Sequence, residues 1–408
     1  MPEKVIAVGV VLPDQSRRVA EEHLDELEKL IETAGGTAIA KILAKRNAPD
    51  AATWIGSGKA EEIQRLAEKE KVSLVVFDDE LSPAQTRNLE KIIGTKVIDR
   101  SALILDIFAG RAKSREARTQ VELAQLEYML PRLTRQWSHL ERQAGGIGTR
   151  GVGETQLEID RRIVRNKISQ LKGELQKIEQ TRQTQRKSRA AAFTVALVGY
   201  TNAGKSTLFN RLTGGSAWAV DKLFATLDAK SQRASFPMPR PTVIIDTVGF
   251  VRKLPHHLVA SFRSTMEEAV SADLVLHVID STHEEQAVVG REVLAELGIP
   301  ESRVIEVFNK EDLSRGFGGT SISALTGRGI EKLVGMIRER ELAGGEVLHL
   351  EIPHEESRTI AKLHEIAEVH EQRSGDQVMQ ITAWVPQNAI HNFAHFSVSD
   401  SLKTAKVG

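Results

Sequence analysis

The stretch from Phe193 to Thr207 decides the fold, and it reads Phe-Thr-Val-Ala-Leu-Val-Gly-Tyr-Thr-Asn-Ala-Gly-Lys-Ser-Thr. Its first six residues form the apolar run typical of a buried strand, and the next eight fit the spacing G-x-x-x-x-G-K-[ST]. Glycines at these positions let backbone N–H groups turn toward phosphate oxygens at a helix N-terminus. The pattern therefore predicts a phosphate-binding loop, although a tight turn with an incidental lysine would give the same letters.

In this loop Lys205 is expected to neutralise the phosphate oxygens of a nucleotide, while the Ser206 hydroxyl binds Mg²⁺. The residues of the loop that we expect to bind the nucleotide are Gly199, Tyr200, Thr201, Asn202, Ala203, Gly204, Lys205, Ser206 and Thr207.

A second motif ends the strand-like run that begins at Val243, where Asp246-Thr247-Val248-Gly249 reads D-x-x-G. The Asp246 carboxylate can hold Mg²⁺ through water, and the Gly249 N–H can sense a γ-phosphate. Turns of this spacing are common, so the motif gains its weight from following a strand and a phosphate loop in that order.

A third motif, Asn309-Lys310-Glu311-Asp312, reads N-K-x-D after the apolar run Val304–Phe308. The Asp312 carboxylate can accept hydrogen bonds from both N1–H and the 2-amino group of guanine, whereas adenine offers neither donor. The later Ser323-Ala324-Leu325 could supply a backbone N–H to guanine O6. These motifs predict binding of GTP and GDP rather than ATP.

Between the phosphate loop and the second motif lies Phe224-Ala225-Thr226-Leu227-Asp228. One threonine in such a loop can bind Mg²⁺ and the γ-phosphate only when GTP is present, which makes the segment a switch. We therefore expect Thr226 to be a second metal ligand and to act in hydrolysis together with Lys205 and Gly249. An ordinary surface loop is the alternative.

The predicted fold class is α/β, with a P-loop GTPase domain over residues 192–343. From Val5 to Ala109, apolar β-type runs alternate with helical ones, which predicts an N-terminal α/β domain with a largely parallel sheet over residues 1–112. Within it, Gly56-Ser57-Gly58-Lys59 lacks phosphate-loop spacing and is interpreted as a plain helix entry. Residues 344–408 predict a small C-terminal α+β domain.

Residues 113–191 predict a long antiparallel helical hairpin, because two heptad-like seams are joined by a glycine-rich interruption. The first arm is expected from about Arg115 to Arg142, with a kink at Pro131. Its seam, spaced by three and four residues, consists of Leu123, Leu126, Leu130, Leu133, Trp137 and Leu140.

The hairpin region is also a cationic block in a chain of zero net charge, with 18 basic residues against 9 acidic ones from Arg111 to Ala190. Five glycines lie within Gly145–Gly153, so the backbone there can approach RNA closely, and basic side chains add attraction to phosphates. A flexible connector or a dimerising coiled coil with solvated charges remains open. The candidate RNA-binding residues are Arg142, Arg150, Arg161, Arg162, Arg165 and Lys167.

Composition excludes several other classes of protein. The chain has no cysteine, so disulfides, thiol catalysis and cysteine-bound zinc are absent, and its twelve histidines form no H-E-x-x-H pair that would predict a metal site. No stretch resembles the roughly 20 apolar residues of a membrane span, and no signal sequence is apparent. We expect a cytoplasmic protein with no integral membrane association.

The motifs together resemble the GTPase domain of the translation-factor-related class, and Phe224–Asp228 with Asp246–Phe250 resembles the HflX family. The glycine-rich Gly148–Glu158 is similar to that family's signature, except that Val152 stands where proline is more usual. The resemblance implies a monomeric factor that hydrolyses GTP, binds the large ribosomal subunit and its RNA, and splits or rescues stalled ribosomes under stress. A GTPase of ribosome assembly or RNA modification, or a GTP-sensing module with negligible turnover, remains the alternative.

The position after the D-x-x-G motif carries Phe250 rather than the glutamine that orients water in Ras-type enzymes. A phenyl ring cannot orient water, so slow intrinsic turnover is expected, unless Arg252 or His256 substitutes for the glutamine. Asn202 resembles the asparagine that helps to bind a potassium ion in several GTPases with a hydrophobic residue at this position. Stimulation by K⁺, in addition to Mg²⁺, is therefore a hypothesis.

Overall fold

The structure, a computed structural model, describes residues 2–133, 156–188, 192–215, 223–224, 228–253, 263–283, 285–313 and 319–398. Its contacts divide the chain into two compact units. The first consists of Met1–Thr181, Val220–Asp228 and Val251–Ser264, and the second of Arg182–Ala219, Ala229–Phe250 and Thr265–Gly408. Two segments of the expected GTPase domain therefore pack with the first unit.

A four-stranded sheet forms the core of the first unit, in the order β2-β1-β3-β4 with every pair parallel. The strands are β1 (Glu3–Val11), β2 (Gly36–Lys45), β3 (Leu74–Phe77) and β4 (Lys96–Asp99). The predicted parallel α/β arrangement is confirmed. Strand order reverses between β1 and β3, and at such a reversal the carboxyl ends of the strands leave a crevice.

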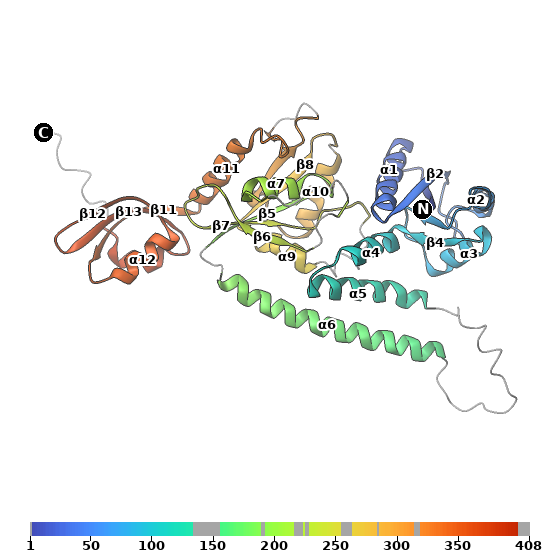
Figure 1. The fold of residues 1–408 in the computed structure, drawn as a ribbon, viewed down its shortest axis with the longest axis horizontal. Helices are drawn as coiled ribbons and strands as arrows, with labels where there is room; N and C mark the ends of the chain where they lie inside the picture. Colours follow the sequence, from blue (N-terminus) through green and yellow to red (C-terminus); the bar gives the residue numbers. More distant parts are fainter. Residues whose placement is uncertain are drawn as a thin grey trace. The chain divides into compact units, whose positions relative to one another are not determined.

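Helices cover both faces of this sheet because each connection between parallel strands is a crossover (Figure 1). Helices α1 (Arg17–Thr33) and α4 (Arg100–Arg111) contact each other on one face, and α2 (Ser57–Glu70) and α3 (Pro83–Ile93) contact each other on the other. Gly56 precedes α2 with a φ of 80°, so the expected plain helix entry is correct.

Two helices follow, α5 (Arg115–Met129) and α6 (Gln156–Ser188), and they lie side by side in Figure 1. Ion pairs link them, with 2.9 Å between Lys172 Nζ and Glu127 Oε1. Helix α5 ends at Met129 and the 3₁₀ turn η1 (Leu130–Arg132) follows, which puts the expected interruption of the first arm at Pro131. Proline lacks an N–H, and its ring clashes with the preceding turn of a regular helix. The rest of the expected arm, up to Arg142, falls in residues 134–155, which lie outside the described chain.

The second unit contains a six-stranded sheet in the order β10-β9-β8-β5-β7-β6. Only β6 runs antiparallel among its pairs. The strands are β5 (Phe193–Gly199), β6 (Lys230–Arg233), β7 (Thr242–Asp246), β8 (Leu274–Asp280), β9 (Val304–Asn309) and β10 (Thr320–Ser321). The helices around them are α7 (Lys205–Thr213), α9 (Arg263–Ser271), α10 (Glu285–Glu296), the 3₁₀ turn η2 (Glu301–Arg303) and α11 (Ile330–Leu342).

The chain ends in a small antiparallel sheet, in the order β11-β13-β12, with a helix packed against it. Its elements are β11 (Gly345–Pro353), α12 (Ser357–Ile366), β12 (Glu368–Ser374), β13 (Val378–Pro386) and the 3₁₀ turns η3 (Ile390–Asn392) and η4 (Ala394–Phe396). The predicted α+β character is confirmed. Among the described helices, none has the length and apolar character needed to cross a bilayer.

Candidate functional site

The loop between β5 and α7 has the backbone of a phosphate-binding loop. Gly199 has a φ of 143°, and a Cβ there would lie 2.1 Å from the carbonyl oxygen of Val278. Gly204 has a φ of 90°, and its Cβ would lie 2.2 Å from Nδ2 of Asn309. Both positions therefore require glycine. No side chain caps α7, so its first N–H groups remain available to an anion.

Lys205 lies buried beneath this loop and holds it closed. Its Nζ donates to the carbonyl oxygens of Gly199 at 3.0 Å and Tyr200 at 2.8 Å. Burial lowers the pKa of Lys205 to about 8, and the Asp246 carboxylate only partly opposes this effect. A bound phosphate chain would add negative charge next to the ammonium and so favour its charged form.

Ser206 and Asp246 meet next to the lysine, with 2.8 Å between the Ser206 hydroxyl and Oδ2 of Asp246. Asp246 is fully buried at the carboxyl end of β7, which pairs in parallel with β5. A hydroxyl and a carboxylate oxygen at a helix N-terminus suit Mg²⁺, a hard cation that takes its remaining ligands from water and phosphate. The predicted ligand Ser206 thus fits a magnesium site. Within the described chain, no group of three or more histidine or acidic residues could hold a metal.

The D-x-x-G segment is joined to the phosphate loop through its backbone. The Phe250 N–H donates to the Gly199 carbonyl at 2.9 Å, and the Thr201 N–H donates to the Phe250 carbonyl at 2.7 Å. A Cβ on Gly249 would lie 2.8 Å from Nζ of Lys205, so only glycine can approach the lysine so closely. Phe250 itself is buried in the hydrophobic core. It packs there and offers no polar group to water.

The N-K-x-D motif connects the loops that surround the base. Asn309 donates from Nδ2 to the Ala203 carbonyl at 2.8 Å and accepts at Oδ1 from the Ala324 N–H at 2.9 Å. Lys310, with a φ of 66°, forms an ion pair with Asp280 across 2.6 Å. Although burial alone would raise it, Lys310 and Thr282 hold the pKa of Asp280 below its ordinary value.

The other residues that we expected to contact the base differ in how exposed they are. Asp312 is exposed, next to the half-buried Glu311. Ser323 is buried, whereas Leu325 is 71% exposed. The Ala324 N–H, one of the backbone groups of Ser323–Leu325 that could serve guanine O6, donates to Oδ1 of Asn309. Rejection of adenine by Asp312 would therefore depend on desolvation of this carboxylate when a base covers it.

Known proteins match this chain over most of its length. Residues 21–109 match a family profile described as GTP-binding GTPase N-terminal, residues 111–189 one described as GTP-binding GTPase Middle Region, and residues 194–310 one described as 50S ribosome-binding GTPase. The GTPase HflX of Magnetococcus marinus is 45% identical over 395 residues, which cover 92% of this chain and 90% of that protein. The GTPase HflX of Escherichia coli is 44% identical over 369 residues, which cover 86% of each chain.

The chain belongs to the HflX family of GTPases. It is accordingly an enzyme that hydrolyses GTP, as its motifs predict. Among solved structures, a GTP-binding protein from the archaeon Sulfolobus solfataricus in complex with GDP is 24% identical, with a TM-score of 0.44, and the match covers 83% of this chain and 98% of that one.

The switch expected in this HflX GTPase is described only at its two ends, because Ala225, Thr226 and Leu227 lie outside the described residues. Phe224 is buried against Phe108 of α4, edge to face, with 4.7 Å between ring centroids. Its φ of 54° is unusual for an aromatic residue, and such a conformation costs about 1–3 kcal/mol unless its surroundings enforce it. Asp228 accepts hydrogen bonds from the N–H groups of Lys113 and Ser114 and from the Ser114 hydroxyl. We expected both Phe224 and Asp228 at the nucleotide, and in the structure they contact α4 and the start of α5.

The candidate RNA-binding residues divide into two groups. Arg142 and Arg150 lie outside the described residues. Arg162 and Arg165 are exposed on α6, and Arg161 is half-buried. Lys167 forms an ion pair with Glu122 of α5 across 3.3 Å. The helix therefore presents at least two guanidinium groups on its surface, and RNA binding by them stays a prediction.

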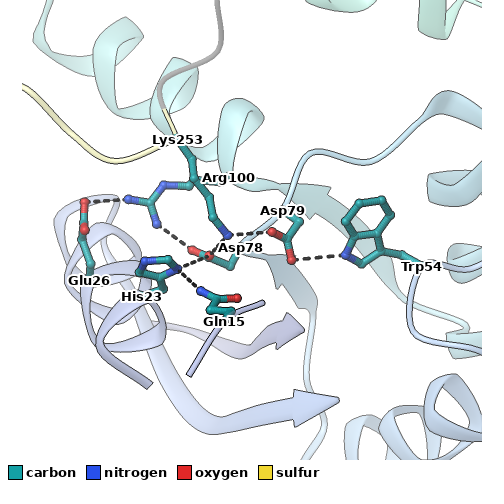
Figure 2. A network of polar contacts seen from close by, with 8 residues as sticks. All are labelled: Gln15, His23, Glu26, Trp54, Asp78, Asp79, Arg100 and Lys253. Atoms are coloured by element: carbon teal, nitrogen blue, oxygen red, sulfur yellow. Dashed lines mark hydrogen bonds and ion pairs between the residues drawn. The ribbon is translucent and has the colours of Figure 1, made fainter. Parts of the chain in front are cut away.

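A polar cluster at the carboxyl edge of the first sheet has no counterpart in the sequence motifs (Figure 2). Lys253 Nζ lies 2.5 Å from Oδ2 of Asp78 and 2.6 Å from Oδ1 of Asp79, while Arg100 contacts Oδ1 of Asp78 at 2.6 Å. Although burial alone would raise it, Arg100 and Lys253 hold the pKa of Asp78 below its ordinary value. In the sequence, the cluster is indicated only by Asp78 and Asp79, which directly follow strand β3. Nothing in the sequence identifies Lys253 as their partner.

Proposed function

We propose that this GTPase acts on the ribosome. It binds the large subunit and its RNA through the N-terminal α/β part and helices α5 and α6, and it splits or rescues stalled ribosomes under stress while GTP hydrolysis times its release. A ribosomal partner implies that it works in the cytoplasm. The observation that carries the proposal is the exposed pair Arg162 and Arg165 on α6. Guanidinium groups there suit RNA phosphates, and the match of residues 194–310 to a profile described as 50S ribosome-binding GTPase supports the same partner.

The nucleotide chemistry assigned to the site follows from its own groups. Lys205 would bind the phosphate oxygens, Gly249 would present its N–H to the γ-phosphate, and Asp312 would accept from guanine. Ser206 and Asp246 would hold Mg²⁺, with Thr226 as a further ligand in the GTP state. When bound, the metal neutralises charge that develops on the phosphates.

Slow intrinsic turnover is part of the proposal, because Phe250 is buried and cannot position water. Asn202, which has a φ of 65° and is exposed on the phosphate loop, would help to bind K⁺ over the phosphates. GTP turnover should therefore be faster in potassium buffer than in sodium buffer of equal ionic strength. Equal rates would remove the potassium site.

Purified large ribosomal subunits provide the main test. They should raise GTP turnover by the full chain, and the stimulated rate should vanish in Lys205→Ala while Lys332→Ala, an exposed lysine of α11, keeps it. Light scattering of intact ribosomes should show splitting that depends on GTP. A chain that large subunits do not stimulate would contradict the proposal. Co-sedimentation with precursor particles, and not with mature subunits, would instead assign the protein to ribosome assembly.

A further inference from the structure

Both described ends of the switch segment are attached to consecutive helices of the first unit. Phe224 is 2% exposed and packs edge to face on Phe108, three residues before the end of α4. Asp228 contacts the start of α5 through Lys113 and Ser114. Since only Ala112–Ser114 separate α4 from α5, the two attachment points lie on either side of one short connection.

Asp228 holds the N-cap residue of α5, Ser114, from outside the helix. The N–H groups of Lys113 and Ser114 donate to its Oδ2 at 3.2 and 3.1 Å, and the Ser114 hydroxyl donates to Oδ1. The Ser114 oxygen in turn accepts from the Ala117 N–H at 3.0 Å, which places it as the N-cap of α5. A carboxylate at this end also complements the partial positive charge of the helix N-terminus. The first turn of α5 therefore depends on a residue more than 100 positions away in sequence.

The same residue is close in sequence to the magnesium site. Asp228 lies two residues before Lys230, the first residue of β6, and Lys230 pairs with Asp246 in the antiparallel ladder. A second restraint comes from chain length, because the four peptide units between Phe224 and Asp228 span at most about 14 Å. If the two attachment points move apart by more than this length, one of the two contacts must release.

We propose that Asp228 is a positioning residue that couples the nucleotide state to helix α5. Its carboxylate joins the switch segment to the residues that begin α5, so that a shift of the segment on GTP binding either moves the start of α5 or releases its N-cap residue, Ser114. This coupling rests on the proposed function in one respect, since it takes residues 224–228 to be the switch. It assigns no contact between Asp228 and the nucleotide.

Hydrogen exchange on the full chain tests the coupling. Backbone exchange in a peptide covering Lys113–Gln120 is compared with GDP bound and with a non-hydrolysable GTP analogue bound, after calorimetry has established saturation with each nucleotide. In the wild type the two states should differ by roughly fivefold, which is the effect of gaining or losing one helix cap. In Asp228→Ala the peptide should exchange quickly in both states, and the difference should fall below about twofold.

Asp50→Ala is a matched control. Asp50 also accepts from two backbone N–H groups, those of Ala52 and Thr53, and from the Thr53 hydroxyl, but it caps a different turn. This variant should leave the difference at α5 unchanged. Ser114→Ala keeps both N–H groups that bind Asp228, so it should retain part of the difference and provides the measurement if Asp228→Ala does not fold.

Two outcomes would overturn the coupling: equal exchange of α5 with both nucleotides in the wild type, or a state-dependent difference that survives in Asp228→Ala. Either result leaves ribosome-stimulated turnover unaffected. Conversely, a nucleotide-dependent α5 in a protein that large subunits do not stimulate would uphold the coupling and contradict the proposed function.

Discussion

Asn309 holds two sides of the nucleotide site together, although the motif that contains it is usually read as recognition of the base. Its amide binds the Ala203 carbonyl on one side and the Ala324 N–H on the other. Both partners are backbone groups, so one buried side chain links the phosphate loop to the loop at Ala324. We therefore expect selectivity for the base to depend on Asp312, which is exposed.

Replacement Asp312→Asn should change which purine the enzyme accepts. An amide cannot accept from both N1–H and the 2-amino group of guanine, so affinity for GTP should fall about 100-fold. Xanthine carries an oxygen in place of the 2-amino group, and the new amide can donate to it. Titration calorimetry with GTP and xanthosine triphosphate checks the prediction. Unchanged affinity for GTP would exclude Asp312 from base recognition, and Glu311→Gln is the neighbouring control.

Helix α10 packs against strand β8 at a glycine, a close approach that the sequence could not have revealed. A Cβ on Gly290 would lie 2.0 Å from Nε2 of His277, and this histidine is 1% exposed. Burial lowers the pKa of His277 to about 4, so the ring that Gly290 accommodates is neutral at physiological pH.

Gly290→Ala should therefore destabilise the second unit by about 1–3 kcal/mol, because the methyl group forces His277 or the helix to shift. Gly335→Ala is the opposite control, since a Cβ there meets nothing within 4 Å and alanine favours the interior of α11. It should stabilise by about 0.5–1 kcal/mol. Urea unfolding of both variants measures the difference, and equal midpoints would contradict the packing described for Gly290.

Helix α6 is the element whose charge the proposed function uses. Changing both Arg162 and Arg165 to glutamate should lower affinity for large ribosomal subunits at least about tenfold and reduce its dependence on salt concentration. The matched control reverses the two exposed charges of Lys332 and Arg340 on α11. Pelleting assays at several salt concentrations separate the two variants, and equal losses in both would show only a non-specific effect of net charge.

At the scale of the whole molecule, the second unit contains a buried carboxyl that joins helix α11 to the connection between β6 and β7. Glu341, fully buried near the end of α11, lies 3.1 Å from Nε of Arg240 in the β6–β7 connection. Its neighbour Glu368 of β12 forms an ion pair with Arg338. Burial raises the pKa of Glu341 to about 7, more than the Arg240 guanidinium lowers it.

A raised pKa in the folded state gives a stability that depends on pH in a defined direction. Protonated Glu341 contributes to the free energy of unfolding, and this contribution is fully present below the ordinary pKa of 4.5 and is lost as the pH rises through about 7. The free energy of unfolding falls by at most about 3 kcal/mol over this range. Glu341→Gln should lack this dependence on pH. Relative to the variant, the free energy of unfolding of the wild type should therefore be higher at pH 5.5 than at pH 8.5. A difference that does not vary with pH would show that Glu341 titrates normally.

Local features of this protein follow from the sequence alone. The phosphate loop, the D-x-x-G and N-K-x-D motifs, and the alternating strands and helices depend on residues within a few positions of one another. Backbone conformation there is set by glycine, by capping side chains such as Ser82, and by apolar spacing. Sequence therefore predicted the α/β fold class and GTP hydrolysis.

Contacts between distant residues were decided only by the tertiary structure. Asp228 meets Ser114 across 114 positions, and Lys253 meets Asp78 across 175. Nothing in the sequence marks these charged residues as partners, because a charge pairs with whichever opposite charge or N–H group the packed chain brings within about 3 Å. Exposure is likewise a property of the packed chain, which is why Asp312 is at the surface and Phe250 in the core. The motifs thus specify the reaction, and the packing specifies which side chains support it.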